Sequence, residues 1–177
     1  MHMNWPEYQK KNIPGVLTVL DVIKEHGIHI TQEEVKTGIE SFKINTGFKG
    51  RWQTLGLNPL IICDTAHNMA GIKVIVEEIS KVEYSNLHIV WGMVVDKEIK
   101  DMLELLPEDA YFYFCRPDIP RGMNADSVYT VAKEMGLKGE IIEDVNEALA
   151  VATSKANKDD MVYVGGSTFV VAEIKDL

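Results

Sequence analysis

The spacing of apolar residues divides the chain into two regions with different periods. Over residues 5–45 the apolar positions recur at helical spacing, as in "GVLTVLDVIKEHG", which stops at Gly27. A second helix is predicted for "TQEEVKTGIESF", because Thr31 followed by Glu34 has the form of a capping box. The first region is therefore expected to be a helical hairpin.

From about residue 51 onward, short apolar runs alternate with amphipathic stretches. The predicted strands cover residues 52–55, 60–64, 88–93, 111–115, 140–142 and 161–164. The predicted helices between them cover residues 70–82, 97–106, 125–135 and 145–156. Runs such as "PLIICD" and "MVYVGG" are apolar without alternation, which is typical of strands covered on both faces. The second region is expected to be an α/β domain with a mainly parallel sheet.

Composition and charge narrow the class of protein. The chain has 177 residues, of which 46% are hydrophobic, so it is long enough to bury a core without disulfides. Cys63 and Cys115 lie in apolar runs and are expected to be buried free thiols, which suits a reducing compartment. We expect a cytoplasmic protein without a membrane span or signal peptide. A net charge of -9 argues against non-specific nucleic-acid binding. Met1 to Met3 are consistent with a cloning remnant.

Polar loops follow four of the predicted strands, at residues 64–68, 93–97, 116–121 and 165–168. In open parallel sheets, ligands bind beyond the carboxyl ends of the strands, so these loops are candidates for one shared site. Each loop also has a structural interpretation: Asn68 or Ser167 can cap a helix, and Asp64 can accept from turn amides. A lone histidine such as His67 is more often hydrogen-bonded structure than a catalytic group. The residues alone leave both interpretations open.

Several common motifs are missing from the sequence. It contains no G-x-x-x-x-G-K-[ST] phosphate-binding loop and no G-x-G-x-x-G after the first predicted strand. Its histidines and cysteines do not have the spacing of a zinc site, so no metal ligand is predicted. The pattern of residues by itself leads to a ligand-binding α/β domain.

The segment "GRWQTLGLNPLIICDTAHNMAGI" resembles the start of the C-terminal domain of the folylpolyglutamate synthase/dihydrofolate synthase family, in the Mur ligase superfamily. The likeness rests on Gly50 and Arg51 and on the Asp-x-Ala-His-Asn pattern that begins at Asp64. It continues in "GMVVDKEIKDMLELLP", in "VYVGGSTFVVAEI" and, upstream, in "EYQKKN". Met69 stands where a proline commonly follows the pattern, and Glu98 stands where a second aspartate is usual.

The resemblance implies a Rossmann-like, mainly parallel six-stranded sheet with helices on both faces, preceded by the helical hairpin. Residues 1–45 would be the helical tail of the preceding ATPase domain, and residues 46–177 the C-terminal glutamate ligase domain. In the family the phosphate-binding loop and most of the Mg2+ and folate contacts lie in that preceding domain. The chain is therefore expected to be a fragment that is inactive by itself.

The family's reaction adds L-glutamate to dihydropteroate or to folate γ-glutamyl tails through an acyl phosphate, using ATP and Mg2+. By resemblance, Arg51, Asp64 and His67 would be catalytic, and Arg51, Asp64 and Asn68 would bind the nucleotide. The residues expected to contact substrate are His67, Lys97, Arg121 and Ser167. Two alternatives stay open: another Mur-type ligase that acts on a peptidoglycan precursor, and a non-catalytic α/β module that binds a ligand or partner.

Overall fold

The chain forms two compact units in a computed structural model that describes residues 6–95, 98–175 and 177. The first unit ends at Lys49 and the second begins at Gly50, whereas the sequence pattern placed the change after residue 45. The predictions for Met1 to Met3 and for Lys97 fall outside the described residues. Within the described residues, no helix has the length and apolar character that crossing a membrane requires.

The first unit is helical. Its elements are α1 (Glu7–Lys10), α2 (Ile13–Glu25), α3 (Gln32–Glu40) and α4 (Phe42–Thr46). The capping box predicted at the start of α3 is confirmed, because the Thr31 hydroxyl accepts from the Glu34 amide at 3.2 Å. In return, the Glu34 carboxylate accepts from the Thr31 amide at 2.8 Å. This exchange satisfies two backbone donors that the first turn of a helix otherwise leaves unpaired.

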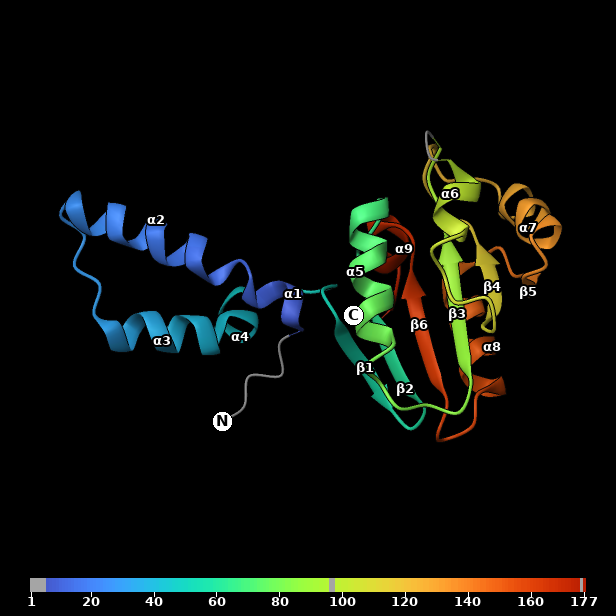
Figure 1. Cartoon of the computed structure of the whole chain (residues 1–177), viewed down its shortest axis with the longest axis horizontal. Helices are drawn as coiled ribbons and strands as arrows, with labels where there is room; N and C mark the ends of the chain where they lie inside the picture. Colours follow the sequence, from blue (N-terminus) through green and yellow to red (C-terminus); the bar gives the residue numbers. More distant parts are fainter. Residues whose placement is uncertain (1–5, 96–97, 176) are drawn as a thin grey trace. The chain divides into compact units, whose positions relative to one another are not determined.

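The second unit contains the mainly parallel six-stranded sheet that was predicted (Figure 1). Its strands are β1 (Gln53–Leu57), β2 (Leu60–Cys63), β3 (Leu87–Gly92), β4 (Tyr111–Cys115), β5 (Lys138–Ile141) and β6 (Met161–Gly165). Their spatial order is β1-β2-β6-β3-β4-β5, and only the β1–β2 pair is antiparallel among the described strands. The last strand of the sequence therefore lies in the centre of the sheet, between β2 and β3.

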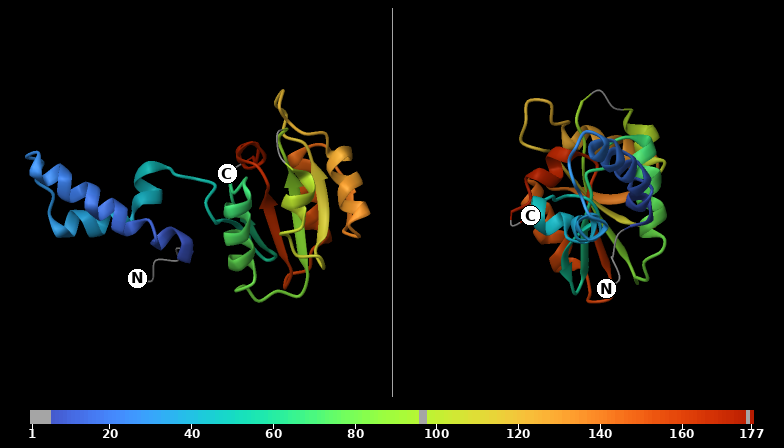
Figure 2. Two further views of the ribbon diagram at one scale, coloured as in Figure 1. Left: turned by 45° about the horizontal axis from the view of Figure 1, so that its top comes forward. Right: turned by 90° about the vertical axis from the view of Figure 1, so that its left-hand side faces the viewer.

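Helices cover both faces of this sheet, as predicted (Figures 1 and 2). The successive connections β2 to β3, β3 to β4 and β4 to β5 all run in the same direction across the sheet. Because such crossovers are right-handed, the helices within these three connections lie on one face. These helices are α5 (Met69–Ile79), α6 (Ile99–Leu103) and α7 (Ala125–Glu134). The connection back to β6 places α8 (Val145–Lys155) on the other face, where it shares a buried cluster with α9 (Thr168–Ala172).

One strand begins earlier than its sequence suggested. The stretch "KGEI" forms β5 from Lys138, two residues before the predicted start, although glycine is uncommon inside strands. A Cβ atom at Gly139 would lie only 2.4 Å from the carbonyl oxygen of Phe112 on β4. The glycine is therefore needed for the close approach of the two backbones.

Both cysteines are buried free thiols, as predicted. Burial raises the pKa of the Cys115 thiol far above its usual range, and the nearby carboxylates of Glu173, Asp144 and Glu143 raise it further. We expect neither cysteine of the native chain to react with an aromatic disulfide reagent at neutral pH, because both side chains are fully buried and out of its reach. Both should react after unfolding in denaturant. Fast labelling of either thiol in the folded chain would contradict this prediction.

Candidate functional site at the carboxyl edge of the sheet

The carboxyl ends of β2, β6, β3 and β4 are neighbours, so the loops that follow them meet along one edge of the sheet. We call this the carboxyl edge. Three of the four predicted loops are fully described, and the fourth is described as far as Val95. The β3 and β4 loops are joined by the Val95 amide, which donates to the Arg121 carbonyl at 2.9 Å. The sequence prediction that these loops converge is confirmed for the described residues.

Asp64 is the most deeply buried polar group of the carboxyl edge, with no exposed area. One carboxylate oxygen accepts from the Trp52 amide at 2.7 Å, and the other accepts from the Ala66 amide at 2.8 Å. The Asp64 amide itself donates to the Val164 carbonyl at 3.1 Å. Asp64 therefore holds together the entry to β1, the turn after β2 and the end of β6, which confirms its structural role as an acceptor.

The backbone before β1 curls tightly to reach Asp64. Gly50 has φ of 76° and Trp52 has φ of 43°, a left-handed conformation that is unusual for a bulky aromatic residue. Such a conformation costs about 1–3 kcal/mol and persists only where the surroundings enforce it. Here it directs the Trp52 amide at the carboxylate, which explains why β1 starts at Gln53 and not at the predicted residue 52.

Gly50 joins the same turn to the segment after β2. Its carbonyl accepts from the Thr65 amide at 2.9 Å. A Cβ atom at this position would lie 2.8 Å from Thr65 Cγ2 and 3.1 Å from Val171 Cγ1. Because Gly50 also needs a positive φ, the site requires glycine for conformation and for space.

Arg51 lies between these two fixed residues and extends outward. Its Nη1 is 3.6 Å from an Asp64 carboxylate oxygen, which is an ion pair longer than a hydrogen bond. The arginine side chain is 42% exposed, whereas the aspartate side chain is fully buried. The buried charge therefore anchors a guanidinium that is accessible to solvent, and a guanidinium is suited to phosphate or carboxylate groups.

His67 and Asn68 begin the turn into α5. The predicted helix cap is confirmed, because Asn68 Oδ1 accepts from the Gly71 amide at 2.8 Å. His67 is exposed, and its Nδ1 lies 3.0 Å from the Thr65 carbonyl. Since a carbonyl only accepts, Nδ1 carries a proton in this contact, and the imidazole keeps Nε2 for any other partner.

The β6–α9 turn brings Ser167 to the same edge. Ser167 is buried, and its hydroxyl accepts from the Phe169 amide at 3.2 Å, which confirms the predicted cap. Gly166 precedes it with φ of 93°, and a Cβ atom there would lie 2.5 Å from the Gly92 carbonyl and 2.9 Å from the Trp91 indole. The turn therefore packs directly on the end of β3.

Two residues of this edge carried no signal in the sequence. Trp91 is buried under the Gly166 turn, and its indole N–H has no hydrogen-bond partner among the described residues. Glu173 accepts from the Asp118 amide and thereby joins α9 to the loop after β4. Burial raises the pKa of Glu173. The hydrogen bond from the Asp118 amide lowers this pKa, and repulsion from the charges of Asp118 and Asp144 raises it. Neither residue belongs to a recognisable pattern, because each acts through contacts between distant segments.

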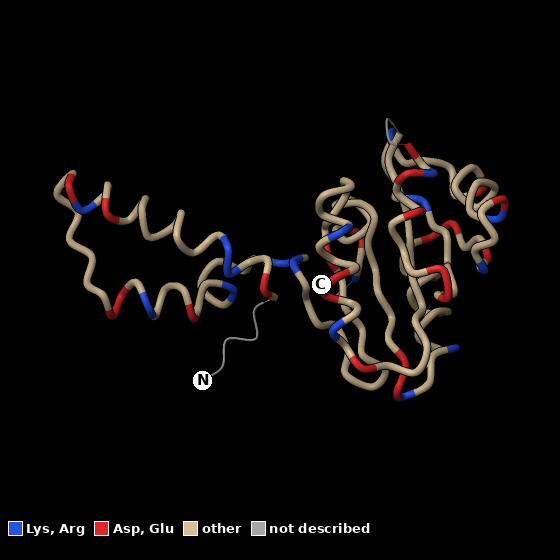
Figure 3. Tube along the Cα trace, in the orientation of Figure 1, with Lys and Arg blue, Asp and Glu red and all other residues tan. Residues whose placement is uncertain are grey.

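The charges of this unit are mixed. Acidic and basic residues are interspersed along the trace of this unit in Figure 3. Within residues 6–95, 98–175 and 177, no group of three or more His, Cys, Asp or Glu side chains is arranged to hold a metal ion. Of the three cations that the sequence predicted for the site, Arg51 is partly exposed, Arg121 is exposed and Lys97 lies outside the described residues.

The sequence profile of the family described as "Mur ligase, glutamate ligase domain" matches residues 50–168. The chain belongs to this family. The match begins at Gly50 and ends at Thr168, so it includes the Arg51–Asp64 pair and the Gly166 turn. The carboxyl edge is therefore part of a Mur ligase glutamate ligase domain.

Two relatives of this glutamate ligase domain carry the names of folate enzymes. A probable bifunctional folylpolyglutamate synthase/dihydropteroate synthase of Haloferax volcanii is 32% identical over 150 residues, covering 80% of this chain and 18% of that protein. The dihydrofolate synthase/folylpolyglutamate synthase of Escherichia coli is 26% identical over 166 residues, covering 93% of this chain and 37% of that protein.

A solved structure shares the fold of this domain. It is the bifunctional folylpolyglutamate synthase/dihydrofolate synthase of Yersinia pestis in complex with AMPPNP and Mn ion, with a TM-score of 0.72 and 28% identity. The likeness covers 88% of this chain and 36% of the Yersinia chain. The chain thus spans well under half the length of each of these three relatives.

Proposed function

We propose that residues 50–177 form the glutamate-adding domain of an ATP-dependent ligase that joins L-glutamate to dihydropteroate or to a folate γ-glutamyl tail. The observation that carries the proposal is the anchored Arg51. Its guanidinium forms an ion pair with the buried carboxylate of Asp64 at the carboxyl edge and is partly exposed to solvent. Both residues lie within the segment that matches the glutamate ligase family. The names of the Haloferax and Escherichia relatives support folate as the acceptor class.

The chemistry explains why an anchored cation is useful. A carboxylate is a poor electrophile, and its conversion to an acyl phosphate supplies a leaving group for attack by the glutamate amine. Negative charge develops on the transferred phosphate and again in the tetrahedral state, so a fixed cation lowers both barriers. In this proposal, the Arg51 guanidinium contacts the phosphate groups of ATP, and the ion pair with Asp64 fixes its position.

We assign Asp64 a positioning role. Its carboxylate has no exposed area, and both oxygens already accept from backbone amides at 2.7 and 2.8 Å. Because the carboxylate is fully buried, a ribose hydroxyl could reach it only if the surrounding turn moved. Asp64 acts instead by holding the backbone on either side of Arg51.

The remaining predicted residues are proposed to contact glutamate or the folate tail. His67 is exposed at the start of α5, and Arg121 is exposed in the loop after β4, where a guanidinium can pair with a carboxylate. Asn68 is proposed to lie beside the nucleotide, although its side-chain oxygen already caps α5. Ser167 would act mainly through its backbone position, because its hydroxyl caps α9. Lys97 keeps its proposed role in carboxylate binding.

We further propose that residues 1–49 are the last helices of a preceding ATPase domain, which would bind most of ATP and Mg2+. Neither α2, α3 nor α4 contains a buried residue. Large apolar side chains of this unit are 42–87% exposed; they are Val16, Leu17, Val19, Val22, Ile28, Ile44 and Phe48. A surface of this kind favours contact with another protein domain.

The test uses a polypeptide that carries this chain together with a phosphate-binding-loop domain. With ATP, Mg2+, labelled L-glutamate and either dihydropteroate or tetrahydrofolate, it should form a labelled amide and release ADP. Arg51→Ala should lower turnover about tenfold to a hundredfold, and Arg51→Lys should restore part of it, because the charge returns without the planar donors. Normal ATP kinetics in Arg51→Ala would contradict the role of Arg51.

The same assay separates the alternatives. Activity only with a peptidoglycan precursor would replace folate with the other acceptor class of the superfamily. Absence of ADP release with every acceptor would favour a non-catalytic binding domain. The isolated chain of 177 residues is expected to fold and to show no turnover, and measurable ligation by it would overturn the proposed dependence on a second domain.

A further inference from the structure

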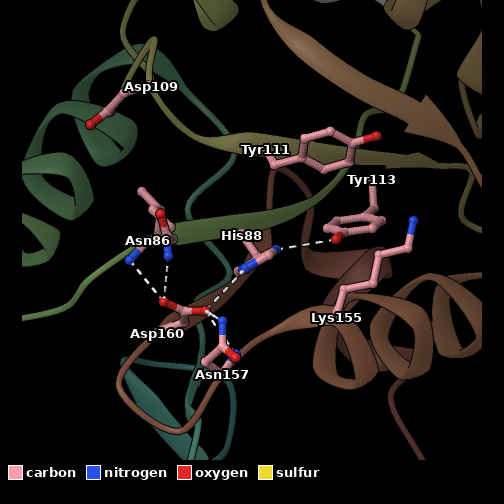
Figure 4. Close-up of a pocket in the computed structure, with 9 residues that line it drawn as sticks. Asn86, His88, Asp109, Tyr111, Tyr113, Lys155, Asn157 and Asp160 are labelled. Carbon is pink, nitrogen blue, oxygen red and sulfur yellow. Dashed lines mark hydrogen bonds and ion pairs between the residues drawn. The ribbon is translucent and has the colours of Figure 1, made fainter.

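A second polar cluster lies at the opposite edge of the sheet, where β3, β4 and β6 begin. We call this the amino edge. It contains a cavity of about 300 Å³, lined by the start of β3, by β4, by the end of α8 and by the loop before β6 (Figure 4). Among the residues proposed for ligation, those that the structure describes do not line this cavity.

Asp160 fixes one wall of the cavity. One carboxylate oxygen accepts from the Asn86 amide at 2.9 Å and from Asn86 Nδ2 at 2.8 Å. The other accepts from the Asn157 amide at 2.7 Å and from Asn157 Nδ2 at 3.1 Å. Because both side-chain nitrogens donate to Asp160, the side-chain oxygens of the two asparagines are left as acceptors.

Aromatic rings form the second wall. Tyr111 and Tyr113 have ring centroids 5.3 Å apart, and the Tyr113 hydroxyl lies 3.1 Å from His88 Nδ1. Burial raises the pKa of Tyr113 to about 12, and the charges of Glu140 and Tyr111 add to this effect, so the group stays a neutral phenol. Tyr111 is 36% exposed.

The ammonium group of Lys155 already lies over these aromatic rings. Lys155 Nζ lies 5.9 Å from the Tyr111 centroid and 5.7 Å from the Tyr113 centroid, within the range of cation–π attraction. The same ammonium is paired with Glu140. The lysine charge is therefore compensated and does not make the cavity attractive to anions.

The remaining charges of the cavity are negative. Asp109 and Asp160 line it, and α8 ends beside it at Lys155, so the negative end of the helix dipole also faces this region. His88 contributes a positive charge only when protonated, and its Nε2 is 3.7 Å from an Asp160 oxygen. Acidic groups, amide oxygens and tyrosine rings together form an environment suited to a cation with N–H donors.

We infer that the cavity at the amino edge binds a small organic cation, namely a guanidinium or primary ammonium group. The cation contacts the Tyr111 ring and donates to the side-chain oxygens of Asn86 and Asn157, and the charge of Asp109 beside the cavity adds a longer-range attraction. This binding site is separate from the carboxyl edge and does not depend on the proposed ligase activity.

The experiment is a titration of the isotope-labelled chain with methylguanidinium, followed by amide NMR at constant ionic strength. We expect saturable shifts at residues 86–88, 109–113 and 155–160. Asp109→Asn and Tyr111→Leu should each weaken binding about threefold or more, since the first removes an attractive charge and the second removes the ring contact. Both side chains are exposed, so the variants should fold. Asp101→Asn, an exposed charge change on α6, is the matched control and should bind normally.

Two further probes test the chemistry of the ligand. Tetramethylammonium has charge but no N–H donor and should bind more weakly than methylguanidinium, and propionate should not bind. Equal affinity for tetramethylammonium would overturn the assignment of an N–H donor, and preference for propionate would overturn the charge argument. Absence of saturable shifts at the cavity, or equal weakening in Asp101→Asn, would overturn the site itself.

Discussion

Replacing Asp160 by alanine is expected to lower the free energy of unfolding of residues 50–177 by about 3–5 kcal/mol. The carboxylate is 2% exposed and accepts four hydrogen bonds from Asn86 and Asn157. Its removal leaves two backbone amides without their partner and releases the loop before β6 from the start of β3. Urea unfolding followed by circular dichroism measures the change.

Asp159→Ala is the matched control for this prediction. Asp159 is the preceding residue, and its side chain is 69% exposed and forms an ion pair with the exposed Lys158. Exposed ion pairs contribute little, so this variant should stay within about 0.5 kcal/mol of the parent chain. Equal stabilities of the Asp159 and Asp160 variants would show that the hydrogen-bond network does not hold the amino edge together.

The effect of Asp160 should also depend on pH. Burial pushes its pKa upward, but the hydrogen bonds from Asn157 and Asn86 outweigh burial, and the pKa ends below the ordinary value of an aspartate. A lowered pKa gives stability that is fully present above the unfolded pKa and is lost as the pH falls through the folded pKa. The difference between the parent and Asp160→Ala should therefore be constant near neutral pH and shrink below about pH 4.

Replacing Asp64 by alanine is the second change with a large expected effect. We expect a loss of about 2–5 kcal/mol, because the amides of Trp52 and Ala66 become unpaired in a buried site. The left-handed backbone at Trp52 also loses the contact that compensates its strain. In a ligase that contains this domain, activity should fall further than in Arg51→Ala, since the guanidinium loses its anchor and the turn loses its shape.

Arg51→Ala separates the two consequences of the Asp64 change. It removes the exposed partner of an ion pair but leaves both amide bonds to Asp64, so stability should change by less than about 1 kcal/mol. Asp64→Asn keeps the volume and one acceptor oxygen, and an intermediate loss is expected. A fully stable Asp64→Ala chain would show that the turn holds without its carboxylate.

Local features of the fold could be predicted from the sequence, because their partners lie a few residues apart. The capping box at Thr31 and the caps at Asn68 and Ser167 each join residues two or three positions apart. The buried strands were also predictable, since their apolar runs are continuous. The position of Asp64 at the end of such a strand was sufficient to place it at the carboxyl edge.

Features that depend on distant segments could not be predicted. The conformation of Trp52 is set by a carboxylate twelve residues later, and nothing in "GRWQ" indicates a left-handed residue. Asp160 bonds to Asn86, which is 74 positions away. The amino edge was missed for this reason: its residues belong to three distant segments of the chain and match no known spacing. The roles of Arg51, His67 and Arg121 in ligation stay predictions.

The central position of β6 constrains how the domain is made. Strands β2 and β3 both pair with β6 and not with each other. Each therefore lacks one of its two neighbouring strands until residues 161–165 leave the ribosome. Most of the sheet must wait for its last strand, and folding depends on contacts between the beginning and the end of the unit. Such late, non-local assembly slows folding and leaves strand edges open to wrong partners. Early termination of translation would therefore leave a divided sheet and not a slightly shortened domain.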